Sequence, residues 1–141
     1  MRDAVGRPQT VLVLGAGSDI AAATLRELRR DGPFTAVLCA RRPESLDTTE
    51  LESSGVEVNR LQFDALAFES HAALIDDVVA RHGDVDLVLL AFGVLGEQAQ
   101  DERDGAAASL VAQTNFVGAV SALTPIVERL RTQGHGTVIV L

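Results

Sequence analysis

Short apolar runs alternate with longer amphipathic segments along the chain. The apolar runs are rich in branched residues and predict strands at residues 11–14, 36–40, 56–63, 87–92 and 137–141. Between them, apolar residues recur every three or four positions, which predicts helices over residues 20–30, 46–53, 70–82 and 106–133. Pro125 lies inside the last segment, where we expect a kink or a break in the helix.

The order of these elements predicts the fold class. Strands that are apolar on both faces and alternate with helices are typical of a parallel sheet covered on both sides. Right-handed crossovers then give an α/β fold with a doubly wound, Rossmann-type sheet of five strands. We interpret residues 1–141 as one dinucleotide-binding domain. Because an unpaired apolar edge strand is prone to aggregate, we expect a truncated form whose C-terminal strands are missing.

Composition narrows the class of protein. Of the 141 residues, 47% are hydrophobic and 23% charged, and the formal net charge of −8 is opposite to the basic footprint of a nucleic-acid binder. No uninterrupted apolar run reaches the ~20 residues of a membrane span, and residues 1–10 lack the apolar core of a secretion signal. We expect a cytoplasmic protein, associated with a membrane only through a lipid substrate. Cys39, the single cysteine, has apolar neighbours and is expected to be buried.

A glycine-containing turn, LGAGSDIAAA, joins the first strand to the first helix. Gly15 and Gly17 supply a G-x-G where the N–H groups of a helix N-terminus suit a pyrophosphate. The third position of G-x-G-x-x-G/A holds Ile20, and the longer G-x-x-x-G-x-G spacing meets Asp19 and Ala21 instead of glycine. Any strand–glycine–helix turn has a similar pattern, so the loop alone does not define a nucleotide site.

Asp19 leaves two interpretations open. With Ser18 as the N-cap, a carboxylate in the first helical turn is stabilised by about 0.3–1 kcal/mol. Alternatively, the same carboxylate places a negative charge beside a pyrophosphate. We favour an outward-pointing side chain, which keeps most of the helix stabilisation and causes little repulsion of a pyrophosphate.

The second predicted strand ends in LCARRPE. At this place in dinucleotide sites an acidic residue binds the ribose 2′-hydroxyl, whereas an arginine receives a 2′-phosphate. Arg41 and Arg42 stand here with no acidic residue before Glu44, which favours NADP(H) over NAD(H). The alternative is two solvated arginines at the end of a strand.

The ends of the third and fourth predicted strands complete the candidate site. Asp64, followed by Ala65, closes the third strand and is suited either to accept a hydrogen bond from an adenine amine or to form a turn. The fourth strand leads into Ala91, Phe92 and Gly93. Because parallel strands end at one edge of the sheet, these residues, Gly15 and Arg41 are expected to share one cofactor-binding crevice.

Four further polar residues carry candidate chemistry. Asn115 stands among apolar residues of the last predicted helix, where it is suited to orient a catalytic group or hold a water; alternatively, the backbone satisfies its side chain. His71, His82 and His135 lie near helix ends, and none has the spacing of metal ligands, so we expect no metal site.

These residues resemble the short-chain dehydrogenase/reductase family, over the whole chain, as its N-terminal half. The loop departs from the family's T-G-x-x-x-G-x-G at two glycines and has Leu14 in place of the threonine. The family's N-N-A-G is here L-A-F-G, which keeps only the glycine. Asn115 and Gly118 match the N-x-x-G motif in full, which implies a catalytic role for Asn115, and Arg41 matches the basic residue of NADP-dependent members.

Three segments, DAVGRPQTVLVLGAGSDI, FDALAFESH and GDVDLVLLAFGVLGE, are similar to one branch of that family. This branch is the decaprenylphosphoryl-2-keto-β-D-erythro-pentose reductases of cell-wall arabinan synthesis, in which an acidic loop residue and A-F-G are normal. The resemblance implies NAD(P)H-dependent reduction of the 2-keto sugar of a polyprenyl-phosphate pentose. It also implies a flavin-dependent oxidase as partner and a homo-oligomer of the full-length protein.

The family's mechanism implies a serine after the fifth strand and a Tyr-x-x-x-Lys beyond it, in which the tyrosine protonates the carbonyl oxygen and the lysine lowers the tyrosine pKa. The chain has no tyrosine, and all 12 of its basic residues are arginine. We therefore expect it to bind a cofactor and to be inactive alone. Two alternatives are a non-catalytic nucleotide-binding or regulatory module, and a flavodoxin-like domain with an acidic cluster at its strand ends.

Overall fold

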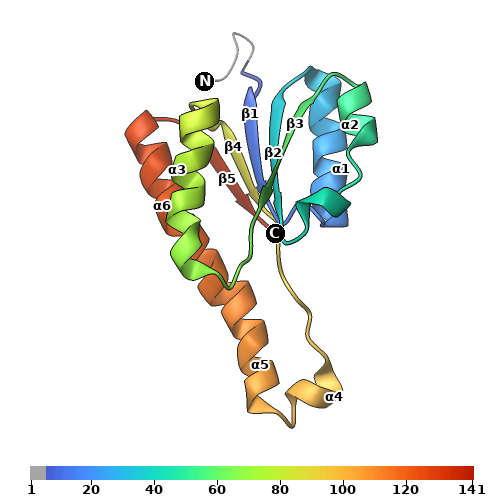
Figure 1. The fold of residues 1–141 in the computed structure, drawn as a ribbon, viewed down its shortest axis with the longest axis vertical. Helices are drawn as coiled ribbons and strands as arrows, with labels where there is room; N and C mark the ends of the chain where they lie inside the picture. Colours follow the sequence, from blue (N-terminus) through green and yellow to red (C-terminus); the bar gives the residue numbers. More distant parts are fainter. Residues whose placement is uncertain (1–5) are drawn as a thin grey trace.

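Five parallel strands form the centre of the structure, a computed structural model that describes residues 6–141. The strands are β1 (Thr10–Leu14), β2 (Thr35–Ala40), β3 (Glu57–Gln62), β4 (Leu87–Leu90) and β5 (Thr137–Val140). They pair in the order β3-β2-β1-β4-β5 (Figure 1). The order reverses between β1 and β4, as in doubly wound sheets that bind dinucleotides. The predicted fold class is confirmed.

Helices cover both faces of this sheet. Helices α1 (Asp19–Leu28) and α2 (Thr49–Ser53) lie on one face, and α3 (His71–His82) and α6 (Gly118–Gln133) lie on the other (Figure 1). Because successive side chains of a strand point to opposite faces, Val11 and Val13 join the first core and Leu12 and Leu14 join the second. All four are at most 1% exposed, which explains why β1 is apolar throughout.

Cys39 lies in the core of the second face, as predicted. Its side chain is fully buried in β2, and burial raises the pKa of its thiol to about 12. The thiol is therefore a small packing group and not a nucleophile.

The N-cap of α1 forms as the sequence predicts. Ser18 has extended backbone geometry and its Oγ accepts a hydrogen bond from the Ala21 N–H at 3.4 Å. After α1 the chain makes a 3₁₀ turn (Arg29–Asp31) that ends at Gly32, whose φ is 143°. The region predicted as helix 46–53 is shorter, because a 3₁₀ turn (Pro43–Ser45) comes first and only α2 is α-helical.

The predicted helix 106–133 is one helical segment in three parts. These are α5 (Gly105–Ala112), a π-helical turn, η4 (Gln113–Val117), and α6. Of the kink or break expected at Pro125, the break does not occur, because α6 continues through this residue. A proline removes one backbone hydrogen bond, and a sixteen-residue helix packed on α3 retains the others. The departure from α geometry lies instead at the π turn.

The helical segment Gly105–Gln133 also meets the length and composition of a membrane span. It has 29 residues, and the mean hydropathy of its most apolar window is 1.4. Polar residues interrupt every apolar run of this segment, so no uninterrupted run is long enough to span a membrane, whereas an average over the window tolerates them. In the structure α6 packs against α3, but only 17% of that window is buried, so the segment meets the criterion by length and composition alone.

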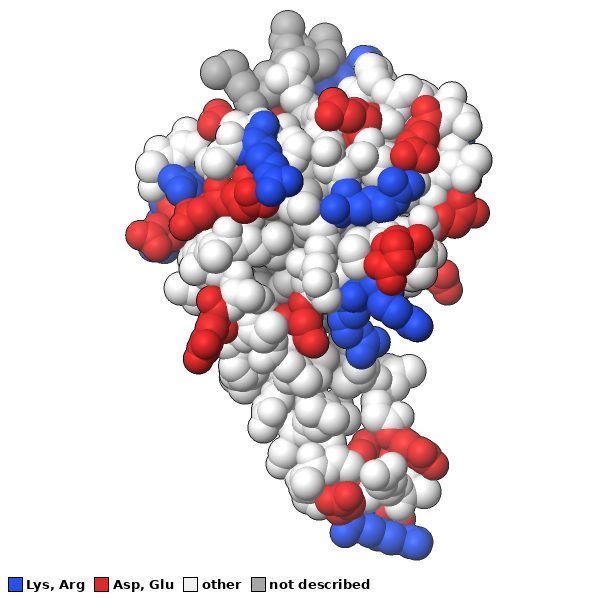
Figure 2. Space-filling model, viewed as in Figure 1, with Lys and Arg blue, Asp and Glu red and all other residues white. Residues whose placement is uncertain are grey.

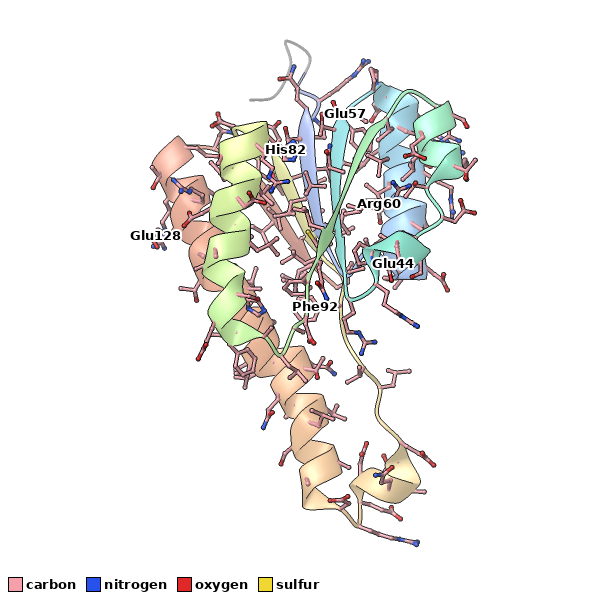
Figure 3. All side chains as sticks on the ribbon, in the orientation of Figure 1. Glu44, Glu57, Arg60, His82, Phe92 and Glu128 are labelled. Atoms are coloured by element: carbon pink, nitrogen blue, oxygen red, sulfur yellow. The ribbon has the colours of Figure 1, made fainter. Side chains whose placement is uncertain are left out.

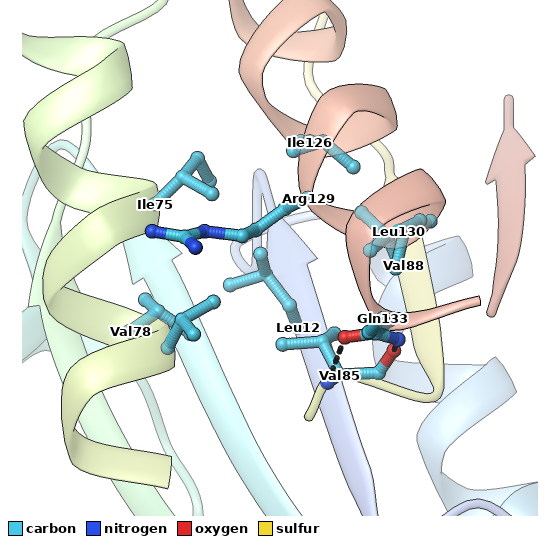
Figure 4. A pocket seen from close by; sticks show the side chains of 10 residues that line it. Leu12, Ile75, Val78, Val85, Val88, Ile126, Arg129, Leu130 and Gln133 are labelled. Carbon is cyan, nitrogen blue, oxygen red and sulfur yellow. Dashed lines mark hydrogen bonds between the residues drawn. The ribbon is translucent and has the colours of Figure 1, made fainter. Parts of the chain in front are cut away.

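A small hollow of about 10 Å³ lies between α3, α6 and the sheet (Figure 4). Arg129 borders it and pairs with Asp76 of α3 at 2.7 Å. Gln133 closes one end, where its amide accepts from the Val85 N–H at 3.2 Å and donates to the Val85 carbonyl at 2.7 Å. The hollow is about the size of one water and has mostly apolar walls, so it is a packing defect and not a ligand site.

The close contact between α6 and the loop after β3 generates a stability prediction. A Cβ at Gly118 would lie 2.7 Å from the Ala65 carbonyl oxygen, whereas a Cβ at Gly105 would meet nothing within 4 Å. We expect Gly118→Ala to lower the free energy of unfolding by about 1–3 kcal/mol, because backbone must move. Gly105→Ala is the matched control and should be neutral or slightly stabilising. Urea titration of both variants measures this, and equal stability would contradict the packing described.

Candidate cofactor site

The carboxyl ends of β1, β2, β3 and β4 meet at one edge of the sheet. Figure 3 shows Phe92 at this edge and Glu44 beside the end of β2, whereas His82 and Glu57 lie at the opposite end. The segments that follow the four strands therefore bring together the residues predicted from sequence. These are Gly15, Gly17, Ser18, Asp19, Ile20, Arg41, Arg42, Asp64, Ala65, Ala91, Phe92 and Gly93.

Gly15 makes the closest backbone approach at this edge. Its φ is +91°, and a Cβ on it would lie 2.5 Å from the Phe92 nitrogen. The N–H groups of Gly15 and Ala16 both donate to the Cys39 carbonyl, at 2.9 and 3.0 Å. The turn is thus fixed between the ends of β2 and β4, and only glycine fits its first position.

The remaining N–H groups of the turn are open. In the described part of the chain, the N–H groups of Gly17, Asp19 and Ile20 have no hydrogen-bond acceptor. A Cβ at Gly17 would meet nothing within 4 Å, so space lies over this backbone. Together with the dipole of the ten-residue α1, these donors fit a phosphate group. Asp19 is exposed, in agreement with the outward-pointing interpretation.

Two arginines follow β2. Arg41 and Arg42 are both exposed, and neither forms an ion pair with the described carboxylates. The Arg42 carbonyl accepts hydrogen bonds from the Ser45 N–H and hydroxyl, at 3.1 and 2.8 Å, which fixes the backbone beneath the guanidinium groups. Both cationic groups are therefore available to an anionic ligand at this edge.

Asp64 forms the turn after β3. Its Oδ1 accepts from the Leu66 N–H at 2.9 Å, and its carbonyl accepts from the Ala67 N–H at 3.1 Å. Asp64 Oδ1 therefore forms the predicted turn. Its Oδ2 remains able to accept a hydrogen bond from an amine of a ligand. Ala65 is 7% exposed and its carbonyl faces Gly118, so its side chain and carbonyl take part in helix packing.

Asn115 lies in the π turn and binds the segment after β4. Its Oδ1 accepts from the Val94 N–H at 2.8 Å, and its Nδ2 donates to the Val94 carbonyl at 2.7 Å. A Cβ at Gly93 would lie 3.3 Å from Asn115 Oδ1, so a larger residue there would crowd this side chain. The backbone thus satisfies the side chain, and Asn115 positions the segment at the cofactor edge. The catalytic role of Asn115 that the family resemblance implies stays a prediction.

His71 is a structural residue that sequence reasoning missed. It is 1% exposed, and its ring stacks on Phe63 with centroids 5.1 Å apart. Its Nε2 lies 2.9 Å from the Asp64 carbonyl and its Nδ1 lies 2.9 Å from Ser121 Oγ. Because a carbonyl can only accept, Nε2 carries the proton, and in the neutral ring Nδ1 accepts from Ser121. His71 therefore ties the loop after β3 to α6.

The other histidines lie away from this edge. His135 Nε2 lies 3.0 Å from Asp84 Oδ2 near the starts of β4 and β5, and His82 ends α3. Among residues 6–141 no group of three or more histidine, cysteine or acidic side chains is placed to hold a metal.

A doubly wound sheet with a glycine turn at its switch point defines a dinucleotide-binding class of protein. The model of the short chain dehydrogenase family matches residues 9–141. The chain therefore belongs to the short chain dehydrogenase family.

Relatives of known sequence agree with this family. An uncharacterized oxidoreductase of Streptomyces coelicolor is 47% identical over 142 residues, covering 99% of this chain and 56% of the relative. An uncharacterized oxidoreductase of Mycobacterium tuberculosis is 35% identical over 133 residues, covering 92% of this chain and 53% of the relative. The chain spans about half the length of the curated relatives it matches.

Solved structures agree with the fold. An NAD⁺-bound xylitol dehydrogenase matches with a TM-score of 0.81 and 25% identity, over 94% of this chain and 52% of that one. An actinorhodin polyketide ketoreductase variant with NADPH matches with a TM-score of 0.81 and 29% identity, over the same shares.

The two hydrogen bonds of Asn115 generate the second prediction. Asn115→Ala should lower the free energy of unfolding by about 1–2 kcal/mol, since two hydrogen bonds are lost. It should also speed hydrogen exchange of the Val94 amide, because that N–H loses its acceptor. Gln113→Ala, an exposed change in the same π turn, is the control. Unchanged Val94 protection, measured by NMR-detected exchange, would show that Asn115 does not hold this segment.

Proposed function

We propose that this chain supplies the nicotinamide-cofactor half of an oxidoreductase that reduces a keto group. The observation that carries this proposal is the glycine turn at the β1–β4 switch point, with open donors at Gly17, Asp19 and Ile20. When bound, the reduced cofactor supplies a hydride to the carbonyl carbon of the substrate.

The residues at the edge fit successive parts of such a cofactor. The N–H groups of Gly17, Asp19 and Ile20 would bind the pyrophosphate. Arg41 and Arg42 would bind a 2′-phosphate, which makes NADP(H) the preferred cofactor. Further along the edge, Asp64 Oδ2 would accept from the adenine amine, and Ala91, Phe92 and Gly93 would border the rest of the cofactor.

Two relatives are described as reductases of keto groups, and they support a keto group as the reacting group. The polyketide ketoreductase variant is 29% identical, and a putative ketoacyl reductase of Streptomyces coelicolor is 34% identical over 112 residues, or 78% of this chain. The chain has no tyrosine and no lysine. We therefore propose that it binds the cofactor without reducing a ketone by itself. A purely nucleotide-binding module is the alternative favoured by the same composition.

The finer proposal is a 2-keto sugar carried on a polyprenyl-phosphate pentose, with a flavin-dependent oxidase as the partner that makes it. It rests on the three sequence segments similar to that branch. A chimera of residues 1–141 with the C-terminal half of the Streptomyces coelicolor oxidoreductase would test it. We expect NADPH oxidation with the keto sugar, whereas oxidation only with a ketoacyl thioester would contradict the finer proposal.

Cofactor titration tests the proposed function. NADPH should bind the 141-residue chain more tightly than NADH, as measured by calorimetry. Arg41→Ala or Arg42→Ala should weaken NADPH binding by about 10- to 100-fold, since a charged hydrogen bond is lost, and leave NADH binding unchanged. Arg26→Ala, an exposed change on α1, is the control.

A glycine variant separates phosphate binding from folding. Gly17→Ala should unfold at the same temperature as the parent, because its Cβ meets no protein atom, yet weaken both cofactors by at least about tenfold. Equal affinity of the parent for NADPH and NADH would refute the arginine argument. Unchanged binding by Gly17→Ala would refute the assignment of the turn to the pyrophosphate.

A further inference from the structure

The loop after β3 holds Asp64 at two places. Its Oδ1 accepts from the Leu66 N–H at 2.9 Å. Its carbonyl accepts two hydrogen bonds, from the Ala67 N–H at 3.1 Å and from His71 Nε2 at 2.9 Å. Because the carbonyl and one carboxylate oxygen are both held, the backbone and the side chain of this residue move as one unit. The direction of Oδ2 therefore depends on the groups that hold the Asp64 carbonyl.

His71 is the more distant of these two groups in sequence, and packing fixes its ring. It is the first residue of α3 and is 1% exposed. Its ring stacks on Phe63 and also lies at 80° to the ring of Phe68, with centroids 6.2 Å apart. An imidazole packed against two phenylalanines has little freedom to rotate, so its Nε2–H keeps one direction.

Ser121 of α6 determines which ring nitrogen of His71 carries the proton. The Ser121 Oγ lies 2.9 Å from Nδ1 and 3.5 Å from the Phe68 carbonyl, so Nδ1 is the nearer acceptor for the hydroxyl. When the hydroxyl donates to Nδ1, the proton of the neutral ring stays on Nε2. That proton is then available to the Asp64 carbonyl at all times.

Charge alone does not select the nucleobase of a ligand at this edge. Figure 2 shows acidic and basic side chains interspersed over the body of the domain on the face drawn. The exposed Arg41 and Arg42 attract the phosphates of any nucleotide, whatever its base. Selection of the base needs a polar group with a fixed direction, and Asp64 Oδ2 is the acceptor assigned to the adenine amine.

We infer that His71, with Ser121 behind it, is a positioning residue that directs the Asp64 carboxylate at the adenine amine and so selects an adenine nucleotide. The connection runs from the Ser121 hydroxyl to His71, and from His71 through the turn to Oδ2. His71 acts through Asp64, because its own side chain is buried. The inference rests on the proposed function, since it requires a cofactor whose adenine lies at this loop.

A comparison of two cofactors by calorimetry tests the inference on the 141-residue chain. NADPH carries an amine on its purine ring, whereas its hypoxanthine analogue carries a carbonyl oxygen at that position. The parent chain should bind NADPH about tenfold more tightly than the analogue, because the carboxylate accepts from the amine and repels the carbonyl. A variant that only lowers stability changes both dissociation constants by the same factor, so their ratio reports the positioning role.

Three variants separate the hydrogen bonds from the packing. His71→Phe keeps an aromatic ring in the buried slot but donates nothing, so the preference for NADPH should fall to about twofold or less. His71→Gln can still donate to the Asp64 carbonyl through its Nε2 and should keep a preference of at least about fivefold. Ser121→Ala frees the ring proton to move to Nδ1 and should lower the preference to about threefold.

Ser121→Ala also guards against a variant that does not fold, since it adds no atom and alanine favours a helix. Ser109→Ala is the matched control, because it removes an exposed hydroxyl of α5 that donates only to the Gly105 carbonyl, and the preference should not change. Circular dichroism verifies the fold of each variant.

The results distinguish failure of the inference from failure of the proposed function. A parent chain that does not bind NADPH would overturn both. A parent that binds both cofactors equally, or one whose preference is unchanged in His71→Phe and Ser121→Ala, would overturn the inference alone and leave His71 a packing residue. A preference lost as fully in His71→Gln as in His71→Phe would also overturn it, since the hydrogen bond to Asp64 would then not be the cause.

Discussion

The candidate site depends on the contact between the backbone of Gly15 and the backbone of Phe92. A side chain at Gly15 would lie 2.5 Å from the Phe92 nitrogen, so the turn after β1 and the segment after β4 can meet only through glycine. On the other side, the Cys39 carbonyl accepts from Gly15 and Ala16. These constraints use the first two N–H groups of the turn and leave those of Gly17, Asp19 and Ile20 open. The two glycines therefore have different roles: Gly15 closes the fold and Gly17 leaves room for a ligand.

Two long-range polar bridges hold the rest of the edge in place. Asn115 binds both backbone groups of Val94, and His71 joins the Asp64 carbonyl to Ser121 of α6. Both bridges start from the helical layer formed by α3, the π turn and α6. The π turn and α6 thus order the candidate cofactor edge.

Much of the fold could be predicted because its signals are local. Apolar runs and helical spacing placed every strand and the main helices, and Ser18 acts as the predicted N-cap. Pro125 was expected to kink or break its helix, and the break does not occur, since α6 continues on both sides of it. Because parallel strands end at one edge of the sheet, the sequence alone predicted that Arg41, Asp64 and Gly93 lie at the same edge. The resemblance to a family was confirmed, and its finer branch stays a proposal.

The bridges could not be predicted from one sequence. Asn115 and Val94 are 21 residues apart, and His71 and Ser121 are 50 apart, and no local pattern couples them. The central claim is that the edge between β1 and β4 binds a nicotinamide dinucleotide. NMR titration of the ¹⁵N-labelled chain with NADPH tests it most directly. The account predicts amide shift changes concentrated at Gly17, Asp19, Ile20, Arg41 and Gly93. Saturating NADPH without shifts at these amides, or with shifts centred on another face, would contradict it.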